Sequence, residues 1–189
     1  TYIEYMKGKK VVFHCNPNNP TGLFTPNYVI KKFIEANPHT LFVIDVAYRN
    51  FSEDLGTDYG SDGLVPETLA DNLLAVYSMT KDYALAGLRL GYMIGTPKMI
   101  EPIRRLCPAW NVNALAQVAG LVALESGTWL RDTMNQLFED KRKLVDELEK
   151  LGLGIKNIKL GEVTLAQEIT PAKKDALVKT LEPLGFEII

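Results

Sequence analysis

The sequence predicts an α/β fold: a mostly parallel sheet covered by helices, followed by a small C-terminal strand–helix–strand annex. Short apolar runs, several of them rich in β-branched residues, are typical of buried strands. The connections between these runs are long or helical, as parallel strands require. Near Gly154 the continuous apolar runs give way to a segment of alternating polarity. We therefore divide the chain into residues 1–152 and residues 153–189.

Four strands are expected in the first part, at residues 11–15, 41–45, 73–77 and 91–95. Thr25 and Pro26 are typical of a helix start, and a helix from there to about Ala36 places apolar side chains on one face, namely Val29, Ile30, Phe33 and Ile34. Further helices are predicted at residues 114–125 and 128–151. Residues 54–72 are rich in Gly, Asp, Ser and Thr and predict a long loop, with a short helix near residues 66–70.

The second part is expected to stand outside the main sheet. Residues 155–167 alternate in polarity and predict one strand. Thr170 and Pro171 then begin a helix that runs to about Leu184. Residues 185–189 are expected to form a closing strand.

Composition and charge exclude several kinds of partner. The 189 residues carry a formal net charge of −2, which gives no electrostatic reason for binding nucleic acid or an anionic membrane. No apolar run reaches the roughly 18 residues that a membrane span needs. Cys15 and Cys107 predict reduced thiols and a cytoplasmic protein. His14 and His39 do not form a metal-binding set.

Polar motifs directly follow three of the predicted strands, at residues 16–22, 45–48 and 78–81. In sheets of this kind, ligands bind beyond the carboxyl ends of the strands. We therefore expect the three motifs to meet at one edge of the sheet, although their spacing alone does not require it.

The residues of these motifs match the needs of an aldehyde cofactor with a pyridine ring. Lys81 is a candidate to form a Schiff base, which a lysine does when its amine is neutral. The ring withdraws electrons only while its nitrogen is protonated, and this requires an opposing carboxylate. Asp45, at a strand end, is the candidate for that carboxylate. Tyr48 and Asn19 are candidate donors to the oxygen on the ring.

A phosphate on the same cofactor needs hydroxyl and guanidinium donors. Ser78 and Arg89 are the candidates, because arginine binds phosphate through parallel hydrogen bonds. The run from Ser78 to Lys81 also fits the Ser-x-x-Lys nucleophile motif of penicillin-binding enzymes. That motif needs a downstream Lys-Thr-Gly, which this sequence lacks, so we favour the cofactor interpretation.

With these motifs in this order, residues 10 to about 150 resemble the large domain of the fold-type-I pyridoxal-phosphate enzymes, the class I/II aminotransferases. The shared motifs are Asn-Pro-Asn-Asn-Pro-Thr-Gly, Asp-x-Ala-Tyr, Ser-x-Thr-Lys and Gly-Leu-Arg-Leu-Gly-Tyr. The most similar branch holds histidinol-phosphate aminotransferase and threonine-phosphate decarboxylase. The resemblance implies pyridoxal 5'-phosphate as cofactor, with Lys81, Asp45 and Tyr48 as catalytic residues. It implies a cofactor-binding set of Asn19, Asp45, Tyr48, Ser78, Lys81 and Arg89.

The implied reaction is amino-group transfer between an amino acid, or a phosphorylated amine like histidinol phosphate, and a 2-oxo acid in amino-acid biosynthesis. The resemblance also implies a homodimer for the full-length enzyme. Two alternatives stay open. One is pyridoxal-phosphate-dependent decarboxylation of a phosphorylated amino acid such as threonine phosphate, and the other is a truncated, non-catalytic module.

The resemblance further implies parts that this chain does not supply. Family members have an N-terminal phosphate-binding loop, an aromatic residue that stacks on the pyridine ring, and a C-terminal arginine that binds the substrate carboxylate. From Lys143 to Ile189 there is no arginine, and we expect the chain to be a fragment. Val46 stands where this branch usually has Glu, at a position that does not contact the cofactor in the family. Residues 153–189 do not resemble the family's small domain.

Overall fold

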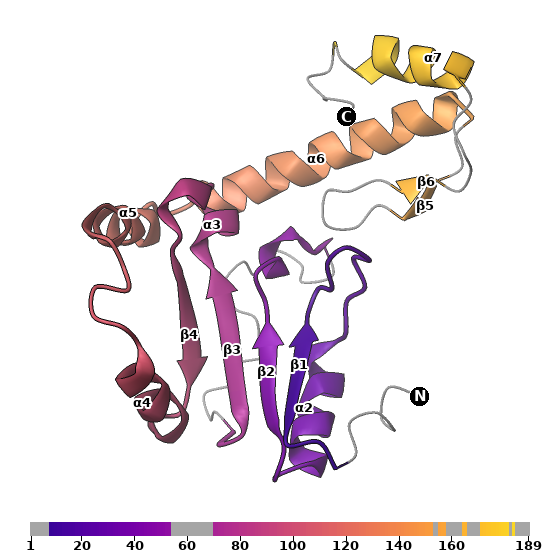
Figure 1. Ribbon diagram of the computed structural model, residues 1–189. Helices are drawn as coiled ribbons and strands as arrows, with labels where there is room; N and C mark the ends of the chain where they lie inside the picture. The colour runs from indigo at the N-terminus through magenta and orange to yellow at the C-terminus, as the bar shows by residue number, and fades with distance from the viewer. Residues whose placement is uncertain are drawn as a thin grey trace.

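A computed structural model describes residues 8–53, 70–152, 155–157, 164–165, 171–181 and 183. Its main sheet has the strand order β1-β2-β3-β4, with bounds Val11–Cys15, Leu41–Asp45, Leu73–Ser78 and Gly91–Gly95. The first three strands run parallel, and β4 pairs antiparallel with β3. The ends of β1, β2 and β3 therefore lie together with the start of β4, at what we call the carboxyl edge (top of the sheet in Figure 1). The predicted α/β fold and its four strands are confirmed.

Helix α2 (Asn27–Ala36) covers one face of the sheet. Its Ile30 and Ile34 are buried in a core with strand side chains that include Phe42, Ile44, Leu73 and Ala75. Burying an aliphatic side chain of this size contributes about 1.5–3 kcal/mol. Successive strand residues point to opposite faces. On β1, Val12 packs against this core, whereas Phe13 points to the other face and is 76% exposed.

The two later helices are also confirmed, as α5 (Ala114–Leu124) and α6 (Trp129–Lys150). Asn113 caps α5, because its side-chain oxygen accepts a hydrogen bond from the amide of Ala116 at 2.9 Å. Ion pairs fasten α6 to the segment that follows β2: Glu53 binds Lys141 at 2.8 Å and Arg142 at 3.2 Å.

Four short or irregular helices were not predicted, namely η1 (Arg49–Phe51), α3 (Met79–Asp82), η3 (Ala86–Leu88) and α4 (Pro97–Leu106). Pro102 lies inside α4, where a proline normally breaks a helix, and this obscures the helical pattern. The start of α2 also differs from prediction, since Pro26 and not Thr25 is the N-cap residue, and the helix begins at Asn27 without a side-chain cap. The predicted loop at residues 54–72 and its short helix fall mostly outside the described residues.

The C-terminal part contains a second, two-stranded sheet. Its strands β5 (Ile155–Asn157) and β6 (Thr164–Leu165) pair antiparallel, so the single strand predicted over residues 155–167 is wrong. Helix α7 (Pro171–Leu181) begins where predicted. The closing strand predicted at residues 185–189 lies outside the described residues.

Gly91 allows the close approach of β3 and β4 next to the carboxyl edge. A Cβ atom at this position would lie 2.6 Å from the backbone oxygen of Tyr77. Because that oxygen belongs to the paired strand, we expect Gly91→Ala to lower the free energy of unfolding by about 1–3 kcal/mol in urea titrations. Gly87→Ala is the control, since no atom lies within 4 Å of its added Cβ. Equal unfolding midpoints for the two variants would contradict this account.

Candidate active site

Strand pairing brings the predicted motifs to the carboxyl edge. Cys15 at the end of β1 pairs with Asp45 at the end of β2, and Asp45 in turn pairs with Val76 of β3. At the end of β3, Ser78 pairs with Gly91 at the start of β4. The three motifs thus begin on adjacent strands, which their spacing alone did not require.

A buried asparagine holds the base of the loop after β1. Asn16 is 0% exposed, and its side chain bonds both backbone groups of Thr25, at 2.7 and 2.9 Å. Its backbone amide donates to the carbonyl of Asp45 at 2.8 Å, so the loop is also fixed to β2. Asn19, the predicted donor to the ring oxygen, is exposed further along this loop. Sequence reasoning missed Asn16, which reads as an ordinary turn residue.

The segment after β2 turns sharply at the carboxyl edge. The Asp45 side chain is exposed, and its Oδ1 accepts a hydrogen bond from the amide of Ala47 at 3.0 Å. Val46 is buried in the core at 2% exposure, so an apolar side chain suits this position. The ring of Tyr48 makes an edge contact with Phe51, with centroids 5.9 Å apart.

Lys81 lies on α3, a single helical turn that starts directly at the end of β3. Met79 and Asp82 are the buried residues of this turn, whereas Lys81 is exposed. The Nζ of Lys81 lies 5.1 Å from the centroid of the Tyr48 ring, within the range of a cation–π contact. The structure therefore brings together two of the predicted catalytic residues.

The two predicted phosphate ligands are not bonded to each other. Ser78 Oγ lies 2.6 Å from Thr80 Oγ1. Arg89 has left-handed backbone angles, φ 55° and ψ 52°, and its Nη1 donates to the carbonyl of Ala86 at 3.0 Å. A guanidinium has further N–H donors, so this bond leaves others for an anion.

Asp82, next to Lys81, is a residue that sequence reasoning missed. Its side chain is almost completely buried, at 8% exposure. Burial raises the pKa of its carboxyl to about 6, and a hydrogen bond with the Asn50 side chain opposes that rise. Within the described residues its Oδ1 has no hydrogen-bond partner. An aspartate after a lysine reads as a surface residue, and only the fold shows that it is buried.

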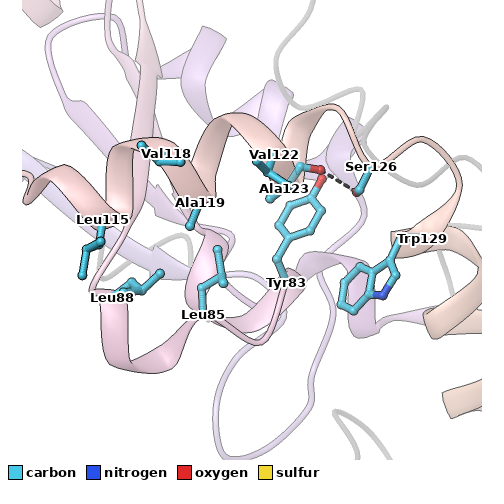
Figure 2. Close-up of a pocket in the computed structure, with 10 residues that line it drawn as sticks. All are labelled: Tyr83, Leu85, Leu88, Leu115, Val118, Ala119, Val122, Ala123, Ser126 and Trp129. Atoms are coloured by element: carbon cyan, nitrogen blue, oxygen red, sulfur yellow. Dashed lines mark hydrogen bonds between the residues drawn. The ribbon is translucent and has the colours of Figure 1, made fainter.

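A neighbouring cavity of about 630 Å³ does not belong to this site. Figure 2 shows it between the segment that holds Tyr83, Leu85 and Leu88 and the apolar side of α5. None of the predicted site residues lines it. Its walls are mainly apolar, so it offers no set of groups for the predicted chemistry.

Other expectations concern metals, thiols and membranes. In the described part of the chain, no cluster of three or more His, Cys, Asp or Glu side chains is placed to hold a metal ion. Burial and the nearby Asp45 carboxylate raise the pKa of the Cys15 thiol. Both cysteines are free. The helices that the structure describes include none with the length and apolar character to cross a membrane.

Residues 3–182 match the family model described as aminotransferase class I and II. The chain therefore belongs to the class I and II aminotransferase family. The match continues past residue 152, so the expectation that residues 153–189 differ from the family is not supported.

Curated relatives indicate a branch of the family. The chain is 32% identical to a histidinol-phosphate aminotransferase of Clostridium novyi, over 94% of this chain and 48% of that protein. It is 34% identical to a dihydroxyacetone phosphate transaminase of Campylobacter jejuni, over 88% of this chain and 44% of that protein. The chain thus spans about half the length of the curated relatives that it matches.

Solved structures show the same fold. The histidinol-phosphate aminotransferase of Clostridium acetobutylicum superposes with a TM-score of 0.74 at 26% identity, covering 94% of this chain and 54% of that one. The histidinol-phosphate aminotransferase of Sinorhizobium meliloti, solved in complex with pyridoxal-5'-phosphate, has a TM-score of 0.71 at 23% identity. The match covers 91% of this chain and 46% of that one. L-threonine-O-3-phosphate decarboxylase of Porphyromonas gingivalis has a TM-score of 0.70 at 24% identity, and the match covers 93% of this chain and 54% of that one.

The buried Asp82 predicts a dependence of stability on pH. Because its pKa is about 6 in the folded chain, above the ordinary value of 3.8 for an aspartate, the folded state holds the proton more tightly. Stability contributed by the protonated form is therefore lost as pH rises from about 3 to about 7, by about 3 kcal/mol in all. We expect Asp82→Asn to remove this loss in urea titrations across that range. Asp146→Asn, on the exposed side of α6, is the control. Parallel profiles for Asp82→Asn and the unmodified chain would contradict the prediction.

Proposed function

We propose that this chain carries part of the active site of a pyridoxal 5'-phosphate-dependent aminotransferase. The observation that carries the proposal is the contact of Lys81 with Tyr48 at a carboxyl edge that also presents Asp45. The Sinorhizobium meliloti enzyme, which has the same fold, was solved with pyridoxal-5'-phosphate. Family membership supports the same class of reaction.

The chemistry of the residues at this edge fits the cofactor. Pyridoxal 5'-phosphate supplies an aldehyde that condenses with an amine and a protonated ring that withdraws electrons from the reacting carbon. An exposed lysine, Lys81, is available to bond with the aldehyde. The exposed carboxylate of Asp45 is suited to hold the proton on the ring nitrogen.

The remaining residues of the proposed set bind and orient the cofactor. Tyr48 and Asn19 would donate hydrogen bonds to the ring oxygen. Ser78 and Arg89 would bind the phosphate, since hydroxyl and guanidinium donors both suit that group. Lys81 would also move the proton at the substrate Cα, because its amine is free once the substrate amine has taken its place on the cofactor.

The proposed substrates are an amino donor and a 2-oxo acid, with a phosphorylated amine like histidinol phosphate as the donor. The relatives named for histidinol phosphate and dihydroxyacetone phosphate support a phosphorylated compound. A homodimer in the cytoplasm stays a prediction for the longer enzyme. Decarboxylation of threonine phosphate and a non-catalytic role stay alternatives. Glutamate formed from 2-oxoglutarate and histidinol phosphate would indicate transfer, and carbon dioxide from threonine phosphate would indicate decarboxylation.

Removing the lysine tests the proposal directly. We expect added pyridoxal 5'-phosphate to give a visible absorbance band with the unmodified chain and no such band with Lys81→Ala, because no other residue is proposed to bond with the aldehyde. Borohydride reduction followed by peptide mass spectrometry should place the cofactor on Lys81. Lys98→Ala is the control, since Lys98 is an exposed lysine paired with Asp71. A band that persists in Lys81→Ala, or is absent from the unmodified chain, would refute the proposal for this chain.

The phosphate role of Arg89 is tested with two ligands that differ only in the phosphate. We expect Arg89→Gln to weaken binding of pyridoxal 5'-phosphate by about tenfold or more, the effect of losing one hydrogen bond between charged groups. Binding of pyridoxal, which has no phosphate, should not change. Equilibrium titrations of the absorbance band measure both affinities. An equal loss for both ligands would mean that Arg89 acts on the fold and not on the phosphate.

A further inference from the structure

The place of the Arg89 side chain depends on its neighbours, because its own backbone conformation is unfavourable. Arg89 directly follows η3 and has left-handed backbone angles, φ 55° and ψ 52°. A residue other than glycine rarely adopts these angles, and it keeps them only where the surrounding structure holds it. A return to ordinary angles would swing the guanidinium to another place. The contacts that hold residues 86–90 therefore determine where this arginine lies.

Two hydrogen bonds hold this segment locally. The amide of Leu88 donates to the carbonyl of Leu85 at 3.0 Å, and Nη1 of Arg89 donates to the carbonyl of Ala86 at 3.0 Å. All of these groups belong to one short turn around η3, which is three residues long. So short a helix is not stable by itself, and these bonds do not fix the turn relative to the rest of the fold.

A side chain at the start of α5 supplies a bond from outside the turn. Nδ2 of Asn113 donates to the carbonyl of Leu88 at 3.2 Å. This carbonyl belongs to the peptide bond between Leu88 and Arg89, so the contact holds the backbone directly before the arginine. The side-chain oxygen of Asn113 accepts from the amide of Ala116 at 2.9 Å. The Asn113 amide is therefore held on both sides, and it joins the turn to α5.

Packing against α5 supports the same segment on both sides of Arg89. Leu88 lines the cavity beside α5 (Figure 2). Gly120 is buried in α5, and a Cβ added there would lie 2.6 Å from Cδ2 of Leu90. Arg89 itself is exposed between these two leucines. Apolar packing allows small sliding movements, whereas the hydrogen bond from Asn113 is directional.

We propose that Asn113 is a positioning residue, which acts through its hydrogen bond to the Leu88 carbonyl to set the place of the Arg89 guanidinium. This inference rests on the proposed function, because it concerns the arginine that would bind the cofactor phosphate. The cap of α5 uses only the side-chain oxygen of Asn113, which serine or aspartate would supply equally well. The amide N–H is a separate group, and its partner is the backbone next to Arg89.

Asn113→Ser separates the two roles of this side chain. The serine hydroxyl can cap α5, but it lacks the amide that reaches the Leu88 carbonyl. We expect Asn113→Ser to weaken binding of pyridoxal 5'-phosphate about threefold or more, the effect of one lost hydrogen bond, and to leave binding of pyridoxal unchanged. Gln117→Ala is the matched control, because Nε2 of Gln117 donates to the carbonyl of Val112 at 2.9 Å at the same end of α5. Equal losses for the two ligands, or for the two variants, would overturn the proposal.

A double variant tests whether Asn113 acts through Arg89. In a chain that already carries Arg89→Gln, we expect Asn113→Ser to cause no further loss of affinity for pyridoxal 5'-phosphate, because the group that it positions is gone. Equilibrium titrations of the absorbance band measure the four affinities. A loss of the same size in both backgrounds would mean that Asn113 acts by another route, and the proposal would be wrong.

A readout without cofactor separates this inference from the proposed function. Phenylglyoxal modifies arginine, and peptide mass spectrometry gives its rate at Arg89 relative to Arg142, an exposed arginine of α6 paired with Glu53. We expect this ratio to rise about threefold or more in Asn113→Ser and to stay within about twofold of the unmodified value in Gln117→Ala. Asn113→Thr, which also keeps a capping hydroxyl, replaces Asn113→Ser if that variant does not fold.

The two readouts fail in different ways. An unchanged Arg89 to Arg142 ratio in the folded serine or threonine variant would contradict the positioning role, whether or not the chain binds cofactor. Absence of the absorbance band from the unmodified chain, with a ratio that rises as expected, would contradict only the cofactor proposal.

Discussion

Parallel pairing of β1, β2 and β3 is the constraint on which the rest of the structure depends. Because these strands run in one direction and in the registers observed, their polar continuations leave the sheet at one edge. The antiparallel return of β4 brings the segment around Arg89 back to the same edge. Each motif is short and unremarkable alone, and the sheet makes them neighbours. The core beneath α2 holds this arrangement, because the alternate side chains of the same strands are buried there.

The carboxyl edge combines rigid supports with exposed chemical groups. The supports are buried: Asn16 fastens one loop to Thr25 by two hydrogen bonds, and Met79 and Asp82 are the buried residues of α3. Lys81 and Asp45, the groups proposed to act on the cofactor, are exposed above them. A reacting side chain must be exposed in order to reach its ligand. Its position must therefore be held by buried residues next to it.

The fold could be predicted from the sequence where the signal is local. Continuous apolar runs identified all four strands, and helical periodicity identified α2, α5 and α6. Lys81 and Asp45 were found because they lie after and at the ends of two strands, where ligands of such sheets bind. The helix α3 was missed because one turn carries no periodicity, and α4 was missed because Pro102 interrupts its pattern. The burial of Asp82 was missed because an aspartate next to a lysine reads as a surface residue, and only the packing of distant segments around α3 buries it.

The exposed side of β1 affects how this protein behaves at high concentration. Val11 and Phe13 are 44% and 76% exposed on a strand that forms one side of the described sheet. Among the described strands β1 pairs with β2 alone, and an edge strand with exposed apolar side chains attracts other strands. A net charge of −2 gives little mutual repulsion between molecules. Colloidal stability, rather than the free energy of folding, therefore sets the concentration at which the isolated chain remains dispersed.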